Sequence, residues 1–142
     1  MAKTVTSLAE LLRSLHPVLN PGVYAFASVA ADTDVSAWAP IATFREAEGL
    51  TVIIEEQHAR RLGLPVLFRS AWLTLTLHSD LQAVGLTAAV ATALARADIG
   101  CNVVAAARHD HLFVPIECAD EALAILQALQ QRSGPGFVPS KA

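Results

Sequence analysis

The sequence has few charged residues, only two cysteines and no long apolar run. Charged residues make up 16% of the 142, and the formal net charge is −3. Its ten lysines and arginines are spread along the chain, so it lacks the basic patch that nucleic-acid binding requires. No apolar run approaches the roughly 20 residues that cross a bilayer. We therefore expect neither a nucleic-acid partner nor a membrane contact.

Two further absences bound the cellular setting. The first residues do not form a signal peptide, because Lys3 is followed by polar residues, so we expect a cytoplasmic protein. Cys101 and Cys118 have no zinc-ligand spacing and are too few for a disulfide framework, which predicts reduced thiols. The hydrophobic content of 54% excludes disorder. A chain of this mass should bury about 68–70% of its extended surface, which suffices for one core or two small ones.

The first half is expected to contain a helix, three strands and a second helix, in that order. Ser7 and Glu10 have the spacing of a capping box before a leucine-rich helix that ends before Pro17. Residues 20–22, Asn-Pro-Gly, predict a turn, and Trp38 is the expected anchor of a polar loop over residues 30–40. The remaining elements are a strand, a hairpin and a short helix, expected at Val23–Val29, Ile41–Glu46 with Leu50–Glu55, and Glu56–Leu62.

The second half begins with the clearest strand, Phe68–His78. It alternates strictly, with Leu73, Leu75 and Leu77 on one face. An alanine-rich helix is expected next, at Ala83–Ala97, followed by two strands at Cys101–Ala107 and His111–Glu117. Asp120 then opens a final helix.

The order of these elements predicts two related units. From Arg69 on, the chain follows β-α-β-β-α, the first five elements of the split βαβ or ferredoxin-like motif. The first half resembles the same motif without its leading strand. We therefore divide the chain into units at 1–68 and 69–133, with a tail at 134–142. Two incomplete units of this size are hard to stabilise alone, so we expect them to complete one another's sheet with the Arg69–His78 strand at the seam.

Several segments carry a resemblance to a known family, most of them in the second half: Leu73–Ser79, Ala83–Ala89, Ala97–Val103 and His109–Pro115, joined by Phe44–Glu46, Glu48–Thr51 and Phe68–Arg69. The chain resembles bacterial tandem ACT-domain proteins of unknown function and is more distantly similar to the regulatory ACT pairs of aspartate kinases and to arginine-sensing ACT proteins. The resemblance implies an α+β fold of two ferredoxin-like units in tandem, with antiparallel sheets and helices on one face.

The resemblance also implies a function, namely amino-acid binding by a regulatory and usually oligomeric protein. The ligand would lie between ACT units, against the turn after the first strand. By this resemblance Gly85 takes the place of the glycine that opens the first helix, and Asp110 that of the acidic residue that contacts the ligand. No kinase or dehydrogenase domain accompanies the two units, so we expect that the regulated partner is another chain or that nothing is regulated.

The residues support a binding site at the strand-to-helix corner over 79–86. The first N–H groups of a helix lack intrahelical partners and attract anions, and a glycine would let a ligand carboxylate approach the backbone. The simpler alternatives are that Gly85 only relieves packing and that Asp110 only makes local hydrogen bonds. The candidate ligand-binding residues are Ser79, Val84, Gly85, Leu86, Cys101, Asn102, His109 and Asp110; no catalytic residue, metal or cofactor is expected.

Two other functions stay open: an interaction module without a ligand, and a small thiol or metal-dependent enzyme. His109 and His111 would share a face if both were extended, with His78 nearby, which is a thin indication of a zinc or nickel site. Cys101 could form a nucleophile and base with His109 or His111, although a small thiol at the start of a strand is usually structural. Glu55 and Glu56 point to different sides of the backbone and form no dyad.

The polar side of the Phe68–His78 strand predicts a covered sheet face, made of Trp72, Thr74, Thr76 and His78. Helices on one side of a sheet leave the other open, and an open face that carries a tryptophan requires a cover. We expect this face, or an edge beside it, to form a symmetric homodimer, with cover by the first half of the same chain as the alternative. Both arrangements bury Trp72.

Overall fold

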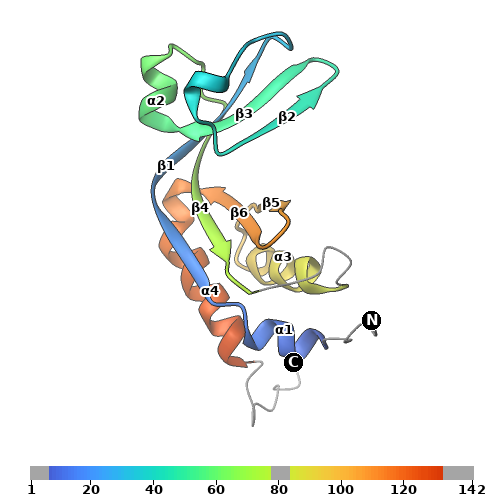
Figure 1. Ribbon diagram of the computed structural model, residues 1–142. Coiled ribbons are helices and arrows are strands. Elements are labelled where there is room, and N and C mark those ends of the chain that lie inside the picture. The colour runs from blue at the N-terminus through green and yellow to red at the C-terminus, as the bar shows by residue number, and fades with distance from the viewer. Residues whose placement is uncertain (1–6, 78–83, 133–142) are drawn as a thin grey trace, which may run out of the picture.

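The structure is a computed structural model that describes residues 7–77 and 84–132. Figure 1 shows two lobes joined by two long strands, β1 and β4. The elements follow the predicted order: α1 Leu8–Arg13, β1 Pro17–Val29, η1 Ser36–Trp38, β2 Ala42–Glu46, β3 Gly49–Glu55, α2 Glu56–Arg61, β4 Phe68–Leu75, α3 Leu86–Arg96, β5 Asn102–Ala105, β6 Asp110–Pro115, η2 Ile116–Cys118 and α4 Ala119–Arg132.

The six strands in the described part of the chain form one antiparallel sheet in the order β2-β3-β1-β4-β6-β5. The two halves therefore complete one another's sheet, as the element order predicted, and β4 pairs with β1 of the first half and with β6 of the second. Trp38 packs against the core of the first half and anchors the loop between β1 and β2.

The turn predicted at residues 20–22 is wrong, because β1 continues through it. The register between β1 and β4 shifts between Asn20 and Tyr24, where β1 has two more residues than its partner. Gly22 adopts a φ of 105°, a left-handed conformation that suits a glycine at such a bulge. An even number of extra residues keeps the same face of β1 buried on both sides of the bulge.

The helix α1 does not pack with the half of the sequence that contains it. Its Leu11 and Leu12, with Leu15 just after the helix, lie in the core formed by α3, α4 and the helix side of β4. Gln130 of α4 reinforces this contact, because its Nε2 donates to the backbone oxygen of Arg13 at 2.9 Å. In the sheet the three strands of the first half lie in the order β2-β3-β1, with β4 of the second half beside β1, and only η1 lies between β1 and β2 where a first helix would stand. The division at residue 68 remains a prediction.

The helices lie on one side of the sheet, and that side contains two apolar cores. In the second half, Leu73 and Leu112 point toward α1, α3 and α4. In the first half, Ala25 and Ile54 point toward α2, and the shared register of β1 and β4 places these side chains on the same face. None of the helices in the described part of the chain is long and apolar enough to cross a membrane.

The opposite face holds an aromatic cluster contributed by both halves. Tyr24 packs edge-on against Trp72 with ring centroids 5.2 Å apart, and Phe26 does so against Phe113 at 5.4 Å. Trp72 is consequently half-buried by residues of its own chain. Side chains of β1 on the same face therefore bury Trp72 in part, and the homodimer expected through this face stays a prediction.

Candidate functional site

The helix α3 begins at a glycine. Its N-cap residue is Gly85, whose φ of 95° lies in the left-handed region, and no side chain caps the helix. The preceding Val84 is 87% exposed, whereas Leu86 is 3% exposed and anchors the first turn in the core. A Cβ at Gly85 would lie 3.4 Å from a methyl group of Leu8 in α1, so α1 lies beside this corner. Among the residues that the structure describes, no side chain caps the first N–H groups of α3.

Asp110 lies at the same end of the sheet. It is the first residue of β6 and pairs with Leu75, the last residue of β4 before the connection to α3. Alternation along β6 turns its side chain to the helix face, where it is 8% exposed. His109 precedes it, with Nδ1 3.3 Å from the backbone oxygen of Leu77. The structure thus brings a buried carboxylate and an uncapped helix start to one end of the second unit.

Two predicted site residues lie elsewhere. Asn102 pairs with Phe113, and three residues separate it along β5 from Ala105, the partner of Asp110. At roughly 3.3 Å per residue, Asn102 lies about 10 Å and Cys101 about 13 Å along the chain from the partner of Asp110, too far to share the polar groups of one small ligand. The structure does not bring these two to the corner, and the prediction for Ser79 lies outside the described residues.

Cys101 has the properties of a core residue. Its side chain packs against the apolar core of the second unit, and burial raises the pKa of the thiol to about 11. A thiol with this pKa is protonated at neutral pH, whereas thiol enzymes act through the thiolate.

The described residues also give no metal site. In residues 7–77 and 84–132, no group of three or more His, Cys, Asp and Glu side chains is placed to hold an ion. His78, the third member of the predicted set, lies outside the described residues.

The sequence reasoning missed a hydrogen-bond network around His111. The indole Nε1 of Trp72 donates to His111 Nδ1 at 3.0 Å, and the Thr74 hydroxyl lies 3.1 Å from the same nitrogen. Asn20, on the neighbouring strand β1, donates to the Thr74 hydroxyl at 3.0 Å. The alternation of the Phe68–His78 strand indicated the face but not these partners, because the pairing of β4 with β6 is non-local.

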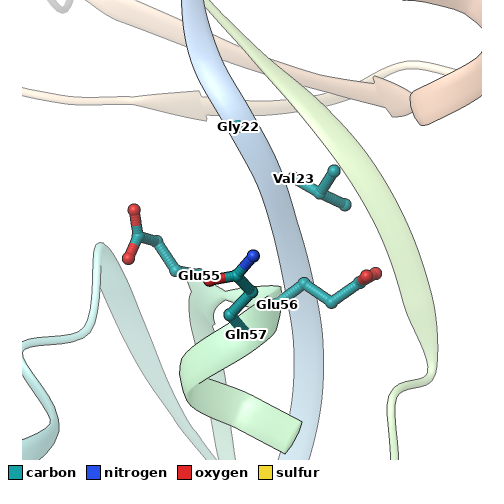
Figure 2. Close-up of a pocket in the computed structure, with 5 residues that line it drawn as sticks. All are labelled: Gly22, Val23, Glu55, Glu56 and Gln57. Atoms are coloured by element: carbon teal, nitrogen blue, oxygen red, sulfur yellow. The ribbon is translucent and has the colours of Figure 1, made fainter.

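Two further features lie where α2 leaves the sheet. A hollow of about 270 Å³ lies between the β1 bulge and the start of α2, and Figure 2 shows Glu55 and Glu56 beside it, pointing in different directions.

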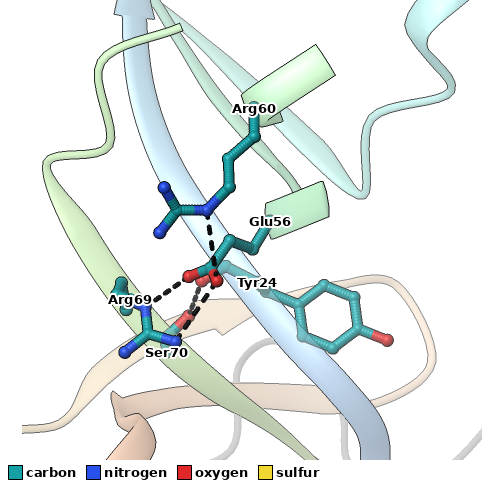
Figure 3. A network of polar contacts seen from close by, with 5 residues as sticks. All are labelled: Tyr24, Glu56, Arg60, Arg69 and Ser70. Carbon is teal, nitrogen blue, oxygen red and sulfur yellow. Dashed lines mark hydrogen bonds and ion pairs between the residues drawn. The ribbon is translucent and has the colours of Figure 1, made fainter. Parts of the chain in front are cut away.

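In Figure 3, Glu56 forms an ion pair with Arg60 and a bidentate contact with Arg69 of β4. These ion pairs lower the pKa of Glu56, the hydrogen bond from Arg69 most. This carboxylate is therefore occupied in joining α2 to β4.

Comparison with known proteins identifies the fold family. Two ACT domain models match the chain, one over residues 3–71 and the other over residues 67–128. The chain is a tandem ACT-domain protein. A Vibrio cholerae protein of unknown function, described as a possible transport protein, is 46% identical to it, with a TM-score of 0.80 over 87% of this chain and 96% of that one.

More distant structures share the tandem ACT fold alone. The regulatory subunit of aspartate kinase from Thermus flavus is 10% identical, with a TM-score of 0.57 over 80% of this chain and 95% of that one. Aspartokinase III from E. coli, solved in complex with aspartate and ADP, is 11% identical, with a TM-score of 0.59 over 80% of this chain and 32% of the enzyme. Among curated proteins, none has a sequence that matches this chain.

Proposed function

We propose that this tandem ACT-domain protein is a non-catalytic regulatory protein that binds a small amino acid at the corner between β4 and α3. ACT domains typically bind regulatory small molecules, and the distant structural neighbours include regulatory subunits of aspartate kinase. The observation that carries the proposal is the uncapped start of α3, at the same end of the sheet as the buried Asp110.

The chemistry of the corner fits the two ends of a zwitterion. The N–H groups of Leu86 and the residues after it can donate to an α-carboxylate at the positive end of the α3 dipole. Asp110 can accept from an α-ammonium or a basic side chain, and His109 and Ser79 are the further polar contacts we propose. Because both charges of the ligand meet opposite charges, the cost of removing them from water is offset.

Regulation requires that the ligand distinguish two arrangements of the protein. A ligand shifts an equilibrium only by the difference between its affinities for the two states. We propose that these states differ in how two copies of this cytoplasmic chain assemble through the β2 edge. That edge strand has unpaired backbone groups, and its Phe44 is 71% exposed.

Thermal-shift measurements with each of the twenty amino acids test the ligand. We expect one or a few to raise the unfolding midpoint at millimolar concentration, because a ligand that binds only the folded state stabilises it. Asp110→Asn should abolish that response, and the matched variant Asp120→Asn, which changes an exposed aspartate of α4, should keep it. The absence of any stabilising amino acid would refute the proposal.

An interaction module without a ligand is the alternative, and exposed apolar residues favour it: Phe44 is 71% exposed and Leu67 70% exposed. This alternative predicts that the protein self-associates or binds a partner chain equally well with and without amino acids. Sedimentation of the wild type and of Phe44→Ser, each with and without the twenty amino acids, separates the two functions.

A further inference from the structure

The two edges of the sheet meet across a groove on the face opposite the helices. The groove has a volume of about 390 Å³ and is lined by residues from both edge strands and from the central strands: Pro40, Ile41, Ala42, Trp72, Val104, Ala106, His111 and Phe113. β2 and β5 are the outermost strands of six, so they can line one groove only because the sheet curls toward this face. The volume lies in the range of small-molecule pockets.

The groove is lined by the imidazole of His111, and the hydrogen bonds of this side chain define its tautomer. An indole nitrogen can only donate, so the Trp72 contact makes His111 Nδ1 an acceptor. A neutral imidazole has one N–H, which must then be on Nε2. In the part of the chain that the structure describes, no acceptor is bonded to this Nε2, and no buried side-chain nitrogen lacks a partner. His111 therefore presents an accessible N–H donor.

The rest of the lining selects against charge. The described residues around the groove include no lysine, arginine, aspartate or glutamate, and the aromatic rings of Trp72 and Phe113 are nearly parallel at 15°. An ionised group in this groove would lose water without gaining an opposite charge, which is costly. A neutral carbonyl oxygen would gain the His111 hydrogen bond without that cost.

We propose that this groove is a second ligand site, for an uncharged aromatic or branched apolar molecule with one carbonyl-type acceptor that bonds to His111 Nε2–H. The groove is separate in space from the proposed amino-acid site, because Asp110 and His111 are consecutive in β6 and point to opposite faces of the sheet.

The test uses benzamide as the probe, with benzoate and toluene as matched compounds that add a charge or lack the acceptor. Two-dimensional NMR of the full-length protein follows the indole N–H of Trp72. We expect benzamide to shift this resonance saturably below about 10 mM, and to bind about tenfold more tightly than benzoate or toluene. Benzoate binding as tightly as benzamide would contradict the proposal.

Three variants locate the site. Val104→Phe puts a larger side chain into the lining of the groove and should remove the response, while Leu67→Phe, at an exposed position outside the lining, should keep it. His111→Asn keeps an acceptor for Trp72, but its shorter amide has no N–H at the position of Nε2, so the variant should fold and lose the preference for benzamide over toluene. The proposal is overturned if Val104→Phe binds benzamide as the wild type does. It is also overturned if the Trp72 resonance shifts with protein concentration alone, which would assign the groove to a second copy.

Discussion

Asp110 and His111 are neighbours in β6 whose side chains serve opposite faces of one sheet. Asp110 pairs with Leu75 and lies on the helix face at 8% exposure. His111 pairs with Thr74 and accepts the Trp72 indole hydrogen on the other face. A shift of one residue in the register of β6 would exchange the two environments. The pairing of β4 with β6 therefore sets the chemistry of both proposed sites.

The protonation of His111 should couple stability to pH. Burial, the largest effect, lowers its pKa, and nearby His109 lowers it further, while Asp110 acts in the opposite direction. The folded protein then binds this proton less readily than the unfolded chain, so the His111 contribution to stability is complete above the ordinary pKa of about 6.5. We expect it to be lost progressively as the pH falls below that value toward the pKa of the folded state.

Urea unfolding between about pH 7.5 and 5 measures this effect. The wild type should lose more stability on acidification than His111→Asn, which has no imidazole at this position. Equal losses in the two proteins would show that the histidine is not responsible.

Cys101 should react slowly with alkylating reagents. With a pKa of about 11, its thiolate fraction near neutral pH is very small. In the single-thiol variant Cys118→Ser, we expect the rate of reaction with iodoacetamide to rise with pH without levelling off below about pH 10. The same variant unfolded in urea gives the control rate of a free cysteine. A plateau near neutral pH would instead indicate an activated thiol and revive the enzymatic alternative.

Gly85→Ala should destabilise the protein by about 1–2 kcal/mol, because a side chain disfavours the left-handed backbone at this position. The new methyl group would also contact Leu8. Gly100→Ala is the matched control, since Gly100 has no positive φ and its added Cβ would meet nothing within 4 Å. Thermal unfolding of the two variants checks the difference. Equal midpoints would mean that Gly85 is not held in the left-handed conformation.

Glu56→Gln should weaken the junction between α2 and β4. Since these ion pairs are close to solvent, we expect the unfolding midpoint to fall by at most about 2–4 °C. Arg69 and Arg60 lower the pKa of Glu56, so its contribution is present above the ordinary value of 4.5 and is lost as the pH falls through the folded-state pKa.

The neighbouring substitution Glu55→Gln is the control for Glu56, because Glu55 points in a different direction (Figure 2). It should leave the midpoint unchanged. If both variants melt at the wild-type temperature, even at low salt, the contact between α2 and β4 contributes nothing measurable.

Local signals in the sequence predicted most elements of this fold. The leucine alternation of β4 and the order of the elements anticipated one shared sheet with β4 at its centre. The bulge in β1 was missed because Asn-Pro-Gly is a strong turn signal, and only pairing with β4 keeps this segment extended. The partner of α1 was missed because an amphipathic stripe shows that a face is buried but not against what.

The sequence by itself determined the element types and the split βαβ order of the second half, because capping, alternation and turn chemistry act between residues close in the chain, whereas Gly85 and Asp110 became candidates through the resemblance to ACT-domain proteins. Only the tertiary structure decided that Asn102 lies away from Asp110, that Trp72 is bonded to His111, and that both sheet edges line one groove. These relations depend on strand register and sheet curvature, which are set by contacts between residues far apart in the sequence.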